Sequence, residues 1–75
     1  MIVLKALRLE RGMTQQQVAE QIGVAKNAVS MWETGKRDPS FDKLIKLSDL
    51  FDCSVDYLLG RSEARRFAVI TIKED

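Results

Sequence analysis

Histidine is absent from the 75 residues of this chain, and cysteine occurs once, at Cys53. A single cysteine cannot form a disulfide within the chain, and no zinc site of Cys and His ligands can be assembled. Nucleophiles that depend on a histidine base are excluded as well. The composition therefore argues against an enzyme and implies neither a cofactor nor a metal site.

Long apolar runs are also missing. No run approaches the roughly 20 residues that a membrane-spanning helix needs. Met1 leads almost directly into a charged helix rather than into a signal peptide. We therefore expect a cytoplasmic protein without a membrane partner.

The net charge is only +1, but the charges are unevenly distributed. Residues 1–37 contain six Lys or Arg against three Asp or Glu, whereas residues 38–75 contain six against eight. The first half is therefore mildly basic. A solvated surface could carry this excess without a partner, so the charge alone favours nucleic acid only slightly.

The pattern around which the chain is organised runs from Thr14 to Glu33. Thr14 can cap a helix, and a glutamine three places on completes a capping box. Gly23 supplies the left-handed residue that ends this helix. Val29 and Trp32, three apart, mark the buried face of a second helix. Two short helices at a glycine corner are typical of a helix-turn-helix, which leaves an outer face of the second helix free to bind.

Three further helices are expected, over residues 2–11, 41–51 and 55–59. Ser40 and Ser54 are natural N-caps for the last two. The apolar spacing in the helix 41–51 predicts four buried side chains, Phe41, Leu44, Leu47 and Phe51. These helices predict an all-α domain over residues 1–60.

Residues 61–75 differ in character from this domain. The segment 67–72 is apolar and β-branched on both faces and is a candidate β-strand. A lone strand leaves its backbone groups unsatisfied, so it needs a partner. We expect it to pair with the same tail of a second subunit through Phe67, Val69, Ile70 and Ile72. Packing on the apolar part of the first helix and a frayed tail are the alternatives.

Several motifs together resemble the phage repressor and Cro type (XRE-like) of helix-turn-helix domain. They are LxxLR from Leu4 to Arg8, then GMTQQQVAEQIGV, AVSMWETGKRDPS and SVDYLL, in the same order over about residues 4–59. The resemblance implies a five-helix, repressor-like domain that places the second helix of the pair in the DNA major groove. It also implies a sequence-specific transcriptional regulator, a repressor that binds a palindromic operator as a homodimer. In this family, Arg8 and Glu33 would form an ion pair that orients the recognition helix.

The recognition helix has two different sides. On a helical wheel, Ala25 shares one side with Val29 and Trp32. The opposite side carries four residues, Lys26, Asn27, Ser30 and Met31. A lysine, an amide, a hydroxyl and an apolar side chain together suit the edges of base pairs in double-stranded DNA. We therefore predict base contacts through these four residues. The alternatives are a plain solvated face and, for Met31, packing against the preceding helix.

Contacts to DNA phosphates are expected around this face. By resemblance, Gln15 touches the DNA backbone, and the free amides and positive dipole at the start of its helix favour an anion there. Gln16 is a weaker candidate of the same kind. Lys36, Arg37 and Lys43 are candidate phosphate contacts that add affinity without sequence information. Each of them could instead be an ordinary surface charge.

Three positions depart from the family's pattern. Ala25 stands where a Ser or Thr commonly caps the recognition helix, so we expect Ala25→Ser to stabilise the fold by about 1 kcal/mol. Asp52 replaces a glycine, which makes a left-handed turn costlier. Cys53 replaces an aliphatic residue and is expected as a small core residue rather than a reactive thiol.

A second hypothesis comes from another functional class. In an antitoxin-like protein, residues 61–75 would bind and block a partner protein, and the helix-turn-helix would serve autoregulation. The tail distinguishes the two hypotheses. If the tail pairs with the same tail of a second subunit, the dimeric regulator is favoured. If the tail becomes ordered only when a second protein is added, the antitoxin is favoured.

Overall fold

The structure is a computed structural model, and it describes residues 2–61. Five α-helices follow one another: α1 (Ile2–Glu10), α2 (Gln15–Ile22), α3 (Lys26–Thr34), α4 (Phe41–Phe51) and α5 (Val55–Leu58). The described part is therefore all-helical with five helices. The candidate strand 67–72, with its proposed dimerisation residues Phe67, Val69, Ile70 and Ile72, lies outside the described residues.

Short polar side chains begin three of these helices. The hydroxyl of Thr14 accepts a hydrogen bond from the backbone amide of Gln17 at 3.0 Å, and Oε1 of Gln17 accepts one from the amide of Thr14 at 2.8 Å. This is the predicted capping box. Ser40 and Ser54 accept in the same way from the amides three residues ahead. These local bonds explain why α2, α4 and α5 begin where the sequence predicts.

Left-handed residues end three of the helices. Gly23 ends α2 with φ 86° and Gly35 ends α3 with φ 82°, a conformation that glycine adopts without steric cost. Asp52 ends α4 with φ 54° and is the one non-glycine residue with positive φ among residues 2–61. The costlier turn predicted at Asp52 is therefore present.

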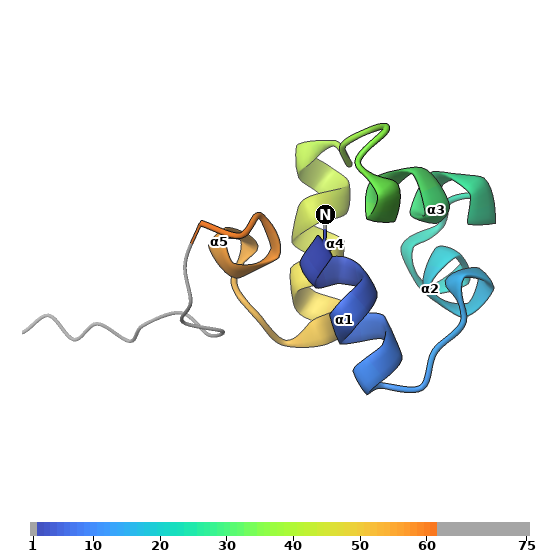
Figure 1. Cartoon of the computed structure of the whole chain (residues 1–75), viewed down its shortest axis with the longest axis horizontal. Helices are drawn as coiled ribbons and strands as arrows, with labels where there is room; N and C mark the ends of the chain where they lie inside the picture. Colours follow the sequence, from blue (N-terminus) through green and yellow to red (C-terminus); the bar gives the residue numbers. More distant parts are fainter. Residues whose placement is uncertain (1, 62–75) are drawn as a thin grey trace, which may run out of the picture.

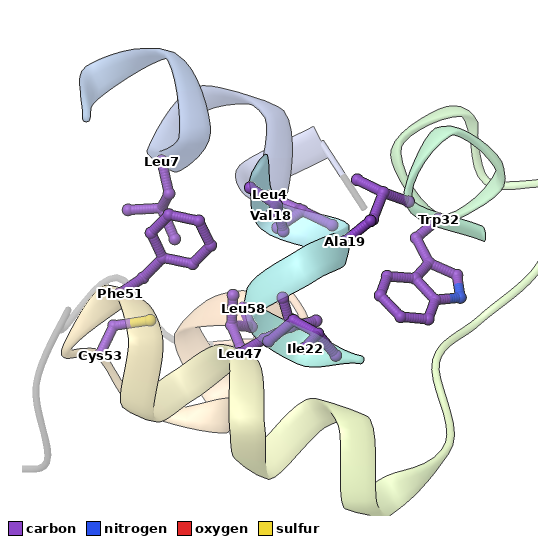
Figure 2. Close-up of a cluster of buried hydrophobic side chains, with 11 residues drawn as sticks. Leu4, Leu7, Val18, Ala19, Ile22, Trp32, Leu47, Phe51, Cys53 and Leu58 are labelled. Atoms are coloured by element: carbon purple, nitrogen blue, oxygen red, sulfur yellow. The ribbon is translucent and has the colours of Figure 1, made fainter. Parts of the chain in front are cut away.

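The helices pack around one apolar core. In Figure 1, α2 and α3 lie together on one side of α1 and α4, while α5 lies on the other side. Figure 2 shows Leu7 of α1 pointing toward the ring of Phe51 in α4. Cys53 is buried in the same core, as predicted. No helix within residues 2–61 combines the length and apolar character needed to cross a bilayer.

Three expectations about burial are wrong. Phe41 is 70% exposed rather than buried, and Leu44 is only half-buried. The fully buried residues of α4 all lie in its second half, so the apolar spacing extends beyond the part of α4 that the other helices within residues 2–61 bury. Ala25 is exposed because it precedes α3 in an extended conformation (φ −78°, ψ 152°), where a helical wheel does not apply.

Candidate nucleic-acid interface

A polar cluster joins α1 to the last turn of α3. Nε of Arg8 donates to Oε2 of Glu33 at 2.6 Å, and Nη2 of Arg8 donates to Oε1 at 3.1 Å. Nη1 of Arg8 also donates to the carbonyl oxygen of Met13 at 3.0 Å, which holds the connection between α1 and α2. Arg8 and Glu33, the two residues that the resemblance pairs, thus form an ion pair with two hydrogen bonds.

The start of α2 adds a third donor to this carboxylate. Nε2 of Gln15 donates to Oε1 of Glu33 at 3.0 Å. The side chain of Glu33 is only 3% exposed, and that of Arg8 is 10% exposed. Sequence reasoning missed the bond between Gln15 and Glu33, because the residues are 18 positions apart and only the packing of α2 against α3 brings them together.

The cluster keeps both partners charged. Burial acts to raise the pKa of Glu33, but the hydrogen bonds from Arg8 and Gln15 and the nearby positive charges of Arg8 and Lys5 outweigh it and lower the pKa. The hydrogen bond to Glu33 raises the pKa of Arg8, against the effect of burial. Glu33 is therefore an ionised carboxylate at neutral pH, and a carboxylate in that form only accepts hydrogen bonds.

A shallow hollow beside the cluster collects predicted DNA-contacting residues from two helices. The end of α1 and the residues before α2 line it, together with Gln15, Gln16 and Lys26. Gln15 is half-buried, whereas Gln16 and Lys26 are exposed. Nε2 of Gln16 donates to Oε2 of Glu20, one turn ahead on the surface of α2, at 3.1 Å. The hollow is thus bordered by the starts of both helices of the helix-turn-helix.

A second hollow lies along α3. Asn27 and Met31 line it together with Trp32 and, from the loop after α3, Arg37. Asn27 is exposed, while Met31 and Ser30 are half-buried. Two of the four residues predicted to contact bases, Ser30 and Met31, are therefore less accessible than the other two, Lys26 and Asn27.

The three predicted phosphate-binding cations lie near the start of α4. Lys36 and Arg37 are exposed in the loop after α3, and the carbonyl oxygen of Met31 accepts hydrogen bonds from their backbone amides at 2.9 and 3.3 Å. Lys43 is half-buried in the first turn of α4. The loop that follows α3 thus carries two of the three cations.

Curated relatives of this chain are transcriptional regulators. The HTH-type transcriptional regulator ImmR of Bacillus subtilis (strain 168) is 43% identical over 63 residues, which cover 84% of this chain and 50% of ImmR. The repressor protein C2 of Salmonella phage P22 is 34% identical over 56 residues, which cover 75% of this chain and 26% of that repressor. The chain thus spans half of ImmR and a smaller share of the phage repressor.

Solved structures of similar proteins share the fold. The P22 c2 repressor, crystallised in complex with a synthetic operator, matches with a TM-score of 0.77 and 31% identity, over 81% of this chain and 92% of that one. A transcriptional regulator from Listeria innocua matches with a TM-score of 0.73 and 30% identity, over 96% and 61% of the two chains. The helix-turn-helix family model itself matches residues 4–58. This chain therefore belongs to the helix-turn-helix family, in its phage-repressor (XRE) branch.

Proposed function

We propose that this chain is a sequence-specific DNA-binding transcriptional regulator, a repressor that binds a palindromic operator as a homodimer and acts in the cytoplasm. The observation that carries the proposal is its likeness to the P22 c2 repressor, whose solved structure includes operator DNA. The likeness covers most of the residues that the structure describes, including both helices of the helix-turn-helix.

In this proposal α3 enters the major groove and reads base edges with Lys26, Asn27, Ser30 and Met31. Lys26 and Asn27 make the principal contacts, because both are exposed in the first turn of α3. No side chain forms a capping hydrogen bond at the start of this helix. Each good base contact contributes roughly 1–3 kcal/mol of discrimination against a wrong base pair.

The phosphates on either side of that groove are held by two further groups of residues. Gln15 and Gln16 contact them at the start of α2, where backbone amides and the helix dipole favour an anion. Lys36, Arg37 and Lys43 add charge contacts from the loop after α3 and the start of α4. These contacts position the domain and make its affinity fall with salt, but they carry no sequence information.

The test is selection of bound sequences from a random pool of double-stranded DNA, carried out at two salt concentrations. We expect the wild-type chain to enrich an inverted repeat. Asn27→Ala should relax the preference at one base pair in each half-site, by roughly 1–3 kcal/mol.

Gln21→Ala is the matched control, because it removes an exposed amide of α2 that is not among the proposed contacts. This variant should select the wild-type motif. Binding that depends on salt but enriches no motif would contradict specific recognition through α3.

A further inference from the structure

The hydrogen bond from Gln15 to Glu33 restricts a side chain that would otherwise rotate. A glutamine amide presents a carbonyl oxygen on one side and an NH₂ group on the other, and the torsion that exchanges them is broad. An ionised carboxylate accepts hydrogen bonds but cannot donate one. The NH₂ group of Gln15 must therefore face Oε1 of Glu33, as it does at 3.0 Å.

The carboxylate that sets this orientation is itself fixed. Its two oxygens accept hydrogen bonds from Nε and Nη2 of Arg8, and the Glu33 side chain is almost wholly buried. Arg8 is anchored in turn by the carbonyl oxygen of Met13. Glu33 is thus a rigid acceptor whose charge is balanced by Arg8.

We propose that Glu33 is a positioning residue for DNA binding, which fixes the amide of Gln15 so that its second N–H faces a DNA phosphate. The inference rests on the proposed function and assigns Glu33 a part in it. One hydrogen of Nε2 is used by Glu33, and the other is left for a phosphate oxygen at the hollow that Gln15 borders. The flipped amide would present its carbonyl oxygen to the phosphate and repel it. Arg8 makes the arrangement possible, because it balances the carboxylate charge near the DNA.

The neighbouring residue Gln16 supplies a contrast within the same helix. Its amide also donates to a glutamate, Glu20, but both side chains are exposed. Side-chain pairs of this kind on a helix surface contribute only a few tenths of a kcal/mol and are not held in one geometry. Glu20→Gln therefore removes the same charge as Glu33→Gln without releasing a fixed amide.

The test is a double-mutant cycle on affinity for the operator selected above, with the full chain. Glu33→Gln removes a negative charge near DNA, so charge alone predicts tighter binding. The positioning role predicts the opposite sign: binding about three- to tenfold weaker, the size of one lost hydrogen bond. In the Gln15→Met background, which keeps the length of the side chain but has no amide, Glu33→Gln should not weaken binding. Glu20→Gln should not weaken binding in either background.

A purely structural role for Glu33 would give a different result. If the carboxylate only holds α3 in place, Glu33→Gln weakens binding by the same factor with Gln15 or Met at position 15, and the positioning role is wrong. If the wild-type chain does not prefer the selected operator over random DNA, the proposed function itself fails. Circular dichroism at the assay temperature ensures that only folded variants are compared.

A second measurement on the wild-type chain covers the case in which Glu33→Gln does not fold. Nuclear magnetic relaxation of the side-chain ¹⁵NH₂ groups should show the amide of Gln15 to be rigid in the free protein. The amides of Gln16 and Gln21, both exposed, should be mobile on the nanosecond scale. An amide of Gln15 as mobile as that of Gln21 would overturn the inference.

Discussion

The two helices of the helix-turn-helix are fastened to the domain differently. α2 is hydrogen-bonded at both ends, by the capping box of Thr14 at its start and by the amide of Gly23 at its end. α3 begins at Ala25 without a side-chain hydrogen bond, and its attachments lie in the last turn, at Glu33 and Gly35. α2 thus has capping hydrogen bonds at both ends, whereas α3 has them only in its last turn. The first turn of α3, where Lys26 and Asn27 are proposed to meet bases, therefore lacks the side-chain cap that begins α2.

Arg8→Ala should lower the stability of the fold more than any other change considered, because it removes the ion pair that joins the last turn of α3 to α1. The change leaves the buried carboxylate of Glu33 without its cation and the carbonyl oxygen of Met13 without its donor. Breaking a buried ion pair from one side costs about 3–5 kcal/mol. A loss of that size is a large fraction of the roughly 5–15 kcal/mol that stabilises a typical domain. Urea unfolding of the wild type and of Arg8→Ala measures this loss in the free energy of unfolding.

Arg11→Ala is the matched control for this prediction. Arg11 is exposed, donates to the carbonyl oxygen of Leu50 at 3.1 Å, and lies 5.7 Å from the centre of the Phe51 ring. An exposed cation–π contact contributes about 0.5–1 kcal/mol. If Arg8→Ala costs no more than Arg11→Ala, the ion pair does not hold the end of α3.

Low pH should weaken the ion pair between Arg8 and Glu33. The folded-state pKa of Glu33 is lowered, so its contribution to stability is fully present above the unfolded-state pKa, about 4.3, and is lost as the pH falls through the folded value. Glu33→Gln lacks this contribution at every pH. The melting temperatures of the wild type and of Glu33→Gln should therefore differ at pH 7 and approach each other as the pH falls from the unfolded-state pKa through the lower folded-state pKa. Parallel curves across this range would contradict a lowered pKa.

The smallest effect is expected from Ala25→Ser, which gives α3 the kind of start that α2 has. The backbone of Ala25 (φ −78°, ψ 152°) already matches that of Thr14 (φ −85°, ψ 164°), so a hydroxyl fits without rearrangement. The backbone amide of Ala28 already donates to the carbonyl oxygen of Ala25 at 2.9 Å, so the new bond shares a donor. We expect a gain of about 0.5–1 kcal/mol in the free energy of unfolding, measured by thermal melting.

Thr14→Ala is the converse change and should cost about 1 kcal/mol. A melting temperature that falls with Thr14→Ala but does not rise with Ala25→Ser would show that α3 needs no side-chain cap. The difference between the two helix starts would then have no energetic consequence.

Features set by neighbouring residues could be predicted from the sequence. The caps at Thr14, Ser40 and Ser54 each depend on an amide three residues away, and all three are present. Phe41 was predicted wrongly, because periodicity identifies an apolar stripe but not where the covering helices stop. The bond between Gln15 and Glu33 was missed for the related reason that it exists only after α2 and α3 pack. The DNA-contacting residues stay predictions that the selection experiment tests.

The three hydrogen bonds donated by Arg8 also constrain how this chain can evolve. A lysine has one compact ammonium group and cannot reproduce the planar fork that reaches both Glu33 and Met13. A single substitution at either position leaves the other charge buried without its partner and destabilises the fold. Neither residue can therefore be replaced alone without a loss of stability. Positions 8 and 33 should therefore covary among homologues, changing as a pair or not at all. Phe41, which is 70% exposed, has no buried charge to balance, and we expect it to vary without a paired change.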